Sequence, residues 1–160
     1  MKILLLNLLS LILLMSCAEQ GKGLDPEELA NELLIIDSHI DVPYRLWRQH
    51  LKGDEIENIA GSTKGDFDFL RAKKGGLNVP FFSIYLPAST QEDGTSHEMA
   101  NQMIDMVEDI ITINSDKFIL INSVDDLASL KTKDVVGIAL GMENGAPIQG
   151  DLSRVQYYFD

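Results

Sequence analysis

The sequence predicts an α/β fold, namely the amino-terminal portion of a (β/α)8 TIM barrel, on three observations. Four continuous apolar runs lack the alternation of half-exposed strands and are typical of parallel strands covered on both faces. They are residues 33–36, 79–86, 118–121 and 135–140. Helical patterns separate these runs, which gives the order βαβαβαβ. No G-x-G-x-x-G turn follows the first run, which disfavours the alternative, an open doubly wound sheet that binds a dinucleotide.

The chain begins with the pattern of a lipoprotein signal peptide, residues 1–16. Lys2 precedes an apolar stretch, residues 3–15, that would cover only about 20 Å of a bilayer core of about 30 Å. Cys17 is the single cysteine, and the tetrapeptide that it ends resembles the bacterial lipobox, whose cysteine is acylated. We therefore expect export, lipidation at Cys17 and anchoring to a membrane of the bacterial cell envelope. An ordinary secretory signal with an incidental cysteine is the alternative.

The rest of the chain divides into a tether and a folded part. Residues 17–26 are polar and contain two glycines, as expected of a tether, and residues 27–160 are expected to form the barrel portion. Because a complete barrel takes about 250 residues, we expect this portion to be truncated. A truncated barrel has an open sheet edge, which a second copy of the chain could cover in a homodimer.

Helix signals mark five segments of the folded part. They are residues 27–32, 66–74, 96–114, 124–130 and 151–160. Pro26 favours the start of the first helix, and Gly75 and Gly76 favour the end of the second. The third carries apolar residues at three- and four-residue steps, which indicates a face packed on the core. Residues 50–65 are charged and have no sustained period, so we expect a long surface insertion there.

The charge balance argues against nucleic acid as a partner. The chain has 13 Lys and Arg residues against 25 Asp and Glu residues, a net charge of −12. Its longest basic block is the pair Lys73 and Lys74, which is too short to follow a phosphate backbone.

Two polar residues follow the first apolar run and could bind a metal ion. His39 and Asp41 are two residues apart, so in an extended segment their side chains project to the same side. Imidazole and carboxylate are both zinc ligands, and barrel enzymes place their chemistry at the carboxyl ends of strands. The alternative is a local hydrogen-bonded turn in which Asp41 or Asp37 holds the imidazole.

A third candidate ligand, Glu143, follows the last apolar run. A buried carboxylate is costly unless it is paired or coordinates a metal, so Glu143 indicates a polar site at the same end of the sheet as His39. A solvated loop carboxylate is the alternative. His50 and His97 are expected to be solvated residues outside the site, and Ser38 lacks the G-x-S-x-G context of a nucleophilic serine.

Three segments in this order resemble the membrane dipeptidase (renal dipeptidase, peptidase M19) family. Residues 35–43, IIDSHIDVP, resemble its opening strand motif, commonly D-x-H-x-D-x-P. Residues 70–85 are similar to its glycine pair and second strand, and residues 137–145 are similar to the strand that carries a metal-binding glutamate.

The resemblance implies a metal-dependent hydrolase of the barrel type with two zinc ions and a dipeptide substrate. By this resemblance His39 and Asp41 would bind one zinc ion and Glu143 would bridge both, with a metal-bridged hydroxide as the attacking group. The family's further histidine ligands, its substrate-binding histidine and arginine and its late aspartate would all lie beyond residue 160. We therefore expect the 160-residue chain alone to hold a partial site and to be inactive.

Two other functions remain open at this stage. The first is a non-catalytic, lipid-anchored remnant or binding module. The second is another metal hydrolase of the amidohydrolase type, but those enzymes usually begin with His-x-His, and here the second position is Asp41.

Overall fold

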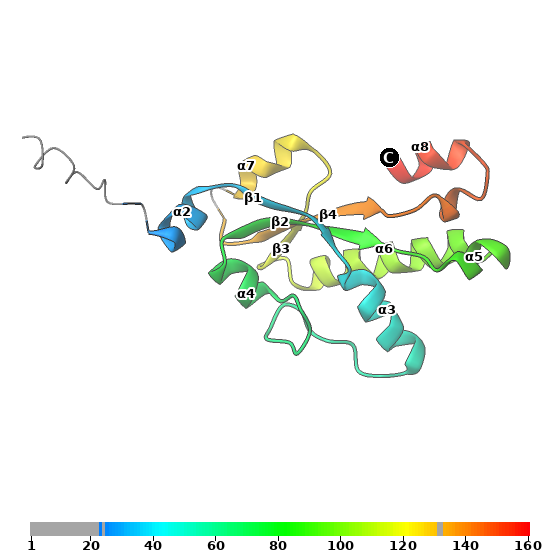
Figure 1. Ribbon diagram of the computed structural model, residues 1–160, viewed down its shortest axis with the longest axis horizontal. Coiled ribbons are helices and arrows are strands. Elements are labelled where there is room, and N and C mark those ends of the chain that lie inside the picture. Colours follow the sequence, from blue (N-terminus) through cyan, green and yellow to red (C-terminus); the bar gives the residue numbers. More distant parts are fainter. Residues whose placement is uncertain (1–22, 24, 131–132) are drawn as a thin grey trace, which may run out of the picture.

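The computed structural model describes residue 23 and residues 25–130 and 133–160 of the chain (Figure 1). The predicted signal peptide, residues 1–16, and the predicted lipidation site, Cys17, lie outside the described residues, as does most of the predicted tether. No helix among the residues described is both long and apolar enough to cross a membrane.

Four parallel strands form one sheet. They are β1 (Ile35–Ile40), β2 (Leu77–Ile84), β3 (Phe118–Leu120) and β4 (Val136–Met142). Their order across the sheet is β1-β2-β4-β3, and each neighbouring pair is parallel. The predicted parallel α/β architecture is confirmed.

The position of β4 between β2 and β3 departs from the simple sequential order of barrel strands. Backbone groups of successive strand residues point to opposite edges, and β4 uses both edges. Its Val136 amide donates to Lys117 O at 2.8 Å on the β3 side, whereas the amide of Glu143, just after the strand, donates to Ile84 O of β2 at 3.3 Å. The short β3 therefore pairs with the first half of β4, and β2 pairs with the second half.

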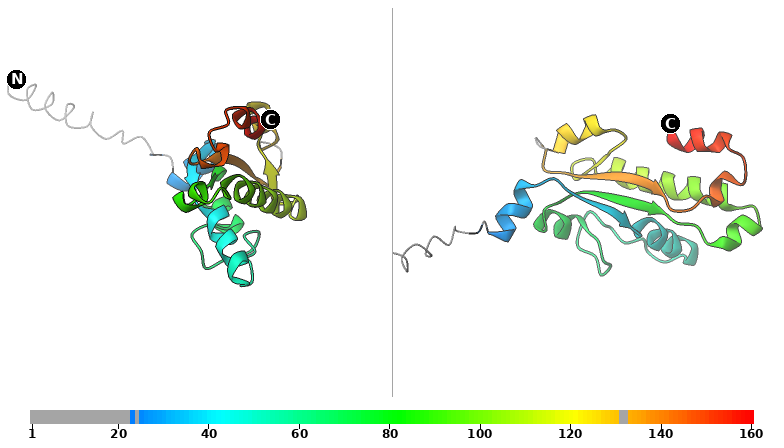
Figure 2. Two further views of the ribbon diagram at one scale, coloured as in Figure 1. Left: turned by 90° about the vertical axis from the view of Figure 1, so that its right-hand side faces the viewer. Right: turned by 45° about the horizontal axis from the view of Figure 1, so that its top comes forward.

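Helices precede, connect and follow the strands along the chain. They are α2 (Pro26–Glu32), α3 (Val42–Lys52), α4 (Phe69–Lys74), α5 (Ala88–Glu92), α6 (Ser96–Ile113), α7 (Leu127–Leu130) and α8 (Ser153–Phe159). Helices α3, α4 and α6 lie below the sheet in Figure 1, and α7 and α8 lie above it in that view. Figure 2 shows the same arrangement from two further directions.

One main core lies between the sheet and helices α3, α4 and α6. Phe82 and Ile138 of the sheet are at most 1% exposed and pack with Leu46 of α3, Ala72 of α4 and Val107 of α6. A second cluster joins Ile84 and Leu86 to Trp47 and Met103. Burial of a large aliphatic or aromatic side chain contributes about 1.5–3 kcal/mol, so these contacts fix the helices against the strands.

The first strand is displaced from the predicted position. Residues 33–36 were expected as a buried strand, but β1 begins at Ile35 and continues through His39. Leu33 and Leu34 precede it and are about half exposed. The physical reason is pairing: β1 follows β2 from the Ile35–Leu77 pair to the Ile40–Phe82 pair, which extends the strand into polar residues.

The predicted surface insertion, residues 50–65, is confirmed for most of its residues, which are exposed or half-buried, and it is wrong at two places. Its first residues belong to α3, which buries Val42, Leu46 and Trp47 and ends at Gly53 in the left-handed conformation. Its later part contributes Ile59, which is 1% exposed and belongs to the main core. Ile59 and the neighbouring Ala60 therefore join the core, while the charged residues of the segment stay at the surface.

His97 was expected to be solvated, but it is half-buried at the start of α6. Its Nδ1 lies 2.7 Å from the hydroxyl of Tyr158, so it ties α8 to α6. Burial, together with the neighbouring Tyr157, raises the pKa of Tyr158 to about 12. His50, in contrast, is exposed as predicted and lies beside Trp47.

The start of α4 depends on a buried carboxylate. Asp68, 1% exposed, accepts hydrogen bonds from the backbone amides of Arg71 at 2.9 Å and Thr63 at 3.2 Å, and from Arg71 Nε at 2.8 Å. Burial acts to raise the pKa of Asp68, but these hydrogen bonds and the Arg71 charge outweigh it and hold the pKa below its usual value.

We expect Asp68→Asn to lower the free energy of unfolding at pH 7 by about 1–3 kcal/mol, because amides and a guanidinium lose a charged acceptor. Since the folded-state pKa is lowered, this stabilisation is present above the ordinary aspartate pKa of about 3.9 and is lost as pH falls through the folded-state value. Urea unfolding at pH 7, 5 and 3 measures the difference. The exposed Asp54→Asn serves as a control, and an equal loss in both variants would contradict the prediction.

Candidate metal centre

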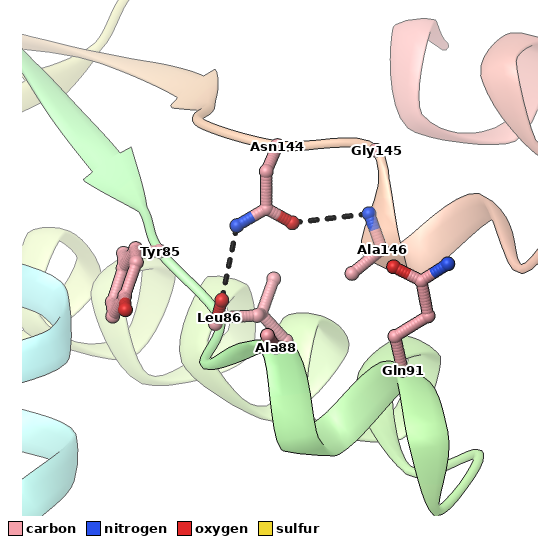
Figure 3. Close-up of a pocket in the computed structure, with 7 residues that line it drawn as sticks. All are labelled: Tyr85, Leu86, Ala88, Gln91, Asn144, Gly145 and Ala146. Carbon is pink, nitrogen blue, oxygen red and sulfur yellow. Dashed lines mark hydrogen bonds between the residues drawn. The ribbon is translucent and has the colours of Figure 1, made fainter.

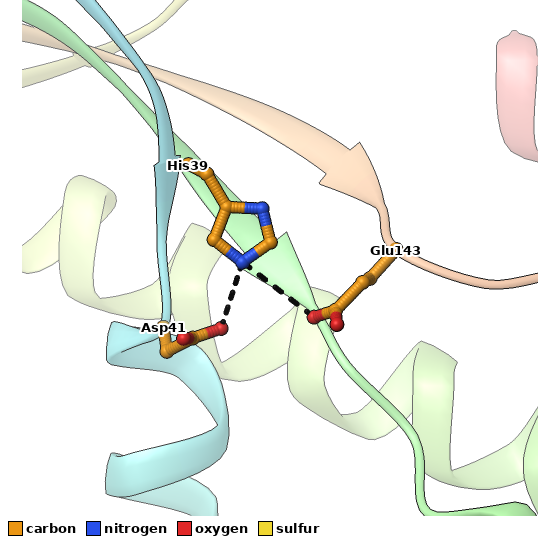
Figure 4. A group of neighbouring side chains, drawn as sticks. All are labelled: His39, Asp41 and Glu143. Atoms are coloured by element: carbon orange, nitrogen blue, oxygen red, sulfur yellow. Dashed lines mark hydrogen bonds and ion pairs between the residues drawn. The ribbon is translucent and has the colours of Figure 1, made fainter.

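Three side chains from distant parts of the chain meet at the carboxyl ends of the strands. His39 is the penultimate residue of β1, Asp41 is the N-cap of α3, and Glu143 directly follows β4 (Figure 4). These are the three metal ligands predicted from the sequence. Because parallel strands end at the same edge of a sheet, the exits of β1 and β4 lie close together with only β2 between them.

The three side chains lie on the face of the strands that points away from the main core. Ile40, next to His39, and Met142, next to Glu143, both pack against core clusters. Successive strand residues point to opposite faces, so His39 and Glu143 project to the other face. The side chains of His39, Asp41 and Glu143 are 51%, 64% and 34% exposed, which leaves the group accessible.

The distances between the polar atoms suit a small metal ion. His39 Nε2 lies 3.1 Å from Asp41 Oδ1 and 3.7 Å from Glu143 Oε2. One ligand atom from each residue lies within 4.8 Å of the others. Ligand atoms around a tetrahedral zinc ion are about 3.4 Å apart, given bonds of about 2.1 Å. Small side-chain movements would therefore let all three contact one ion.

The donor set itself fits a divalent cation. It combines one imidazole with two carboxylates. The negative charge of the two carboxylates favours binding of a cation between the three side chains. Zinc accepts this combination, and harder divalent ions such as manganese also accept oxygen-rich donor sets.

An irregularity in β1 aims His39 at the site. Between Asp37 and Ile40 the strand advances three residues while β2 advances two, from Pro80 to Phe82. An extra residue of this kind turns neighbouring side chains and is common next to active sites. The carboxylate of Asp37 accepts a hydrogen bond from the backbone amide of His39 at 3.0 Å. Asp37 therefore provides a hydrogen-bond partner for the backbone where the pairing of β1 with β2 is irregular.

The local-turn alternative explains only part of this arrangement. Asp41 does contact the imidazole, whereas Asp37 binds the His39 backbone and not the ring. A local turn gives no reason for Glu143, which comes from the other end of the folded part, to lie 3.7 Å from the same nitrogen.

One residue of the site was missed in the sequence. Ser83 of β2 is 3% exposed, and its hydroxyl donates a hydrogen bond to Glu143 Oε2 at 2.7 Å. The available signal was a small polar residue inside the apolar run of residues 79–86.

A pocket opens among the residues that directly follow Glu143 and β2. It has a volume of about 510 Å³ and is lined by residues of the segments that follow β2 and β4, among them Tyr85, Gln91 and Asn144 (Figure 3). Asn144 shapes it, because its side-chain amide donates to Leu86 O and its oxygen accepts the Ala146 amide, both at 3.0 Å. Volumes of this order are typical of small-molecule sites.

A parallel α/β sheet with an imidazole and two carboxylates at the carboxyl ends of its strands is typical of barrel metallohydrolases. A sequence profile of the membrane dipeptidase family (peptidase family M19) matches residues 25–160. The chain therefore belongs to this family, whose members are metal-dependent dipeptidases, and the resemblance noted in the sequence is confirmed.

Solved structures of this family share the fold. Dipeptidase AC, a metallopeptidase of family M19, is 21% identical with a TM-score of 0.63 over 79% of this chain and 39% of its own. A metallopeptidase from Rhodobacter sphaeroides, bound to a phosphinate mimic of the dipeptide L-Ala-D-Ala, is 19% identical with a TM-score of 0.64 over 79% and 42%. The probable dipeptidase PvdM from Pseudomonas aeruginosa is 20% identical with a TM-score of 0.65 over 83% and 34%.

These similarities confirm the fold class, a portion of a TIM-barrel α/β fold. The matches cover between 34% and 42% of the three related structures, so this chain spans well under half of their length.

We expect zinc to stabilise the chain through this group. At a free zinc concentration of 100 times the dissociation constant, the free energy of unfolding should rise by about 2.7 kcal/mol, and a chelator should reverse the gain. His39→Ala should abolish it, because the imidazole is central to the group. Denaturant unfolding with and without zinc measures the effect.

The matched control is His50→Ala, which removes an exposed histidine outside the group. Equal loss of the zinc effect in His50→Ala and His39→Ala would show that zinc binds elsewhere.

Proposed function

We propose that this chain supplies the amino-terminal part of a zinc-dependent dipeptidase, with His39, Asp41 and Glu143 as metal ligands. The observation that carries the proposal is the approach of Glu143 to His39, 3.7 Å between Oε2 and Nε2, at the carboxyl edge of the sheet. Membership of a family of metal-dependent dipeptidases supports the same assignment.

Each ligand has a defined role in this proposal. His39 offers Nε2 of a neutral imidazole, and Asp41 offers a carboxylate that is not used to cap α3, since it makes no side-chain cap hydrogen bond. Glu143 offers two oxygens, and by resemblance to the family it would bridge two zinc ions. Zinc in such a site polarises a carbonyl oxygen and lowers the pKa of water toward neutrality, which is the chemistry that peptide hydrolysis needs.

A dipeptide is the proposed substrate. The related Rhodobacter sphaeroides enzyme binds a phosphinate mimic of L-Ala-D-Ala. In this chain, the pocket beside Glu143 has the size for a small ligand, and Gln91 and Asn144 give it polar groups. A pocket of this volume suits a short substrate.

We propose that the 160 residues alone do not complete the catalytic site. The metal-binding group found among the described residues has three members, and the family resemblance implies further histidine ligands for a second zinc ion. The exposed Ile36 and Phe81, at 47% and 36%, support contact with additional polypeptide over β1 and β2, and a homodimer remains one form of it.

We expect residues 18–160 with added zinc to hydrolyse Gly dipeptides or L-Ala-D-Ala no faster than the His39→Ala variant. The reason is that three donors hold one ion at most, whereas the proposed chemistry uses two. Release of free amino acid measures the rate. Turnover clearly above the variant would overturn this expectation and would assign a complete site to the chain.

We also propose that the protein is an exported lipoprotein anchored through Cys17, because a short apolar segment precedes this single cysteine. Attached acyl chains contribute about 0.8 kcal/mol per buried CH₂, which is enough for stable anchoring when more than one chain is attached.

In a bacterial host, the wild-type chain should incorporate labelled fatty acid and sediment with membranes. Cys17→Ser should lose the label and appear in the soluble fraction, because the acylated thiol is absent. Ser16→Ala, a neighbouring change that keeps the cysteine, is the control. Equal labelling of Cys17→Ser and wild type would refute the anchor.

A further inference from the structure

We propose that Ser83 is a positioning residue that holds the Glu143 carboxylate in the orientation needed to bind metal. This inference rests on the proposed metal centre and adds a residue that does not itself contact the ion.

The backbone brings Ser83 and Glu143 together through the pairing of β2 with β4. Ser83 is the register partner of Gly141, two residues before Glu143. The Glu143 amide donates to Ile84 O at 3.3 Å, so the residue after Ser83 anchors the main chain of the ligand. This pairing places the Ser83 hydroxyl near the carboxylate of Glu143, which directly follows β4.

The side-chain contact is short and directed. Ser83 Oγ donates to Glu143 Oε2 at 2.7 Å, which is a usual length for a hydrogen bond from a hydroxyl group to an oxygen. The same Oε2 lies 3.7 Å from His39 Nε2, so Ser83 holds the oxygen that faces the other ligand. A carboxylate oxygen has two lone pairs, so Oε2 can accept the Ser83 proton and still face an ion beside His39.

The burial of Ser83 distinguishes it from a residue that acts on substrate. Its side chain is 3% exposed, whereas the side chain of Glu143 is 34% exposed. Ser83 thus lies beneath the carboxylate, on the protein side of the site. A buried donor of this kind orients a flexible ligand, and loss of such partners typically weakens metal binding by about 10- to 100-fold.

The test compares two buried serines in the full chain. Ser83→Ala should weaken zinc binding by about 10- to 100-fold, measured by competition with a chromophoric chelator, and should change the visible spectrum of bound cobalt. Ser96→Ala is the matched control, because Ser96 is fully buried and donates to Ala146 O at 2.8 Å, outside the metal-binding group. Equal weakening in the two variants, or none in Ser83→Ala, would overturn the proposal.

Ser83→Thr provides a second variant in case Ser83→Ala does not fold. It keeps the hydroxyl donor, so its zinc affinity should stay within about 10-fold of wild type. A larger loss in Ser83→Thr would count against a positioning role.

A different measurement tests the inference if the chain binds no metal. If wild type binds no zinc, the proposed function fails, and a double-mutant cycle of Ser83→Ala and Glu143→Ala then decides the inference without metal. Because the two groups share a hydrogen bond, their effects on urea unfolding should be non-additive. Additive effects would show that Ser83 does not hold Glu143.

Discussion

The parallel pairing of β2 with β4 is the constraint on which the rest of the structure depends. It places the exit of β4 beside β2 and within reach of the exit of β1, although β1 and β4 are far apart in the chain. The same pairing buries Phe82 and Ile138 against the helices on one face. The register of β2 against β4 therefore has two results. It places apolar residues on one face of the sheet, where they form the core, and it places Ser83 and Glu143 on the other face, where they lie together with His39.

Regular strand geometry alone would not give the observed site. β1 departs from regular pairing between Asp37 and Ile40, and Asp37 compensates by accepting the His39 amide. The first aspartate of the D-x-H-x-D pattern thus has a structural explanation: it supports the backbone that presents the histidine. The last, Asp41, begins α3 and keeps its carboxylate free of a capping bond.

The sequence predicted those features that depend on local pattern. The apolar runs of β2, β3 and β4 and the long amphipathic α6 appear close to their expected positions, and His39, Asp41 and Glu143 lie together as expected. Features set by long-range pairing were not predictable in this way. The place of β4 beside β2 depends on contacts between segments far apart, and local periodicity carries no information on it. The contact of Ser83 with Glu143 depends on the same pairing, so an isolated serine in an apolar run gave no indication of its partner.

The position of Asp41 at the start of α3 has a practical consequence. The same helix carries Trp47, which is the single tryptophan of the chain and is 8% exposed within the core. Asp41 and Trp47 are separated by less than two helical turns, since an α-helix has about 3.6 residues per turn. The tryptophan fluorescence of this protein, excited apart from its four tyrosines, therefore comes from one residue on the helix that Asp41 caps, and it can be followed during a metal titration without an added label.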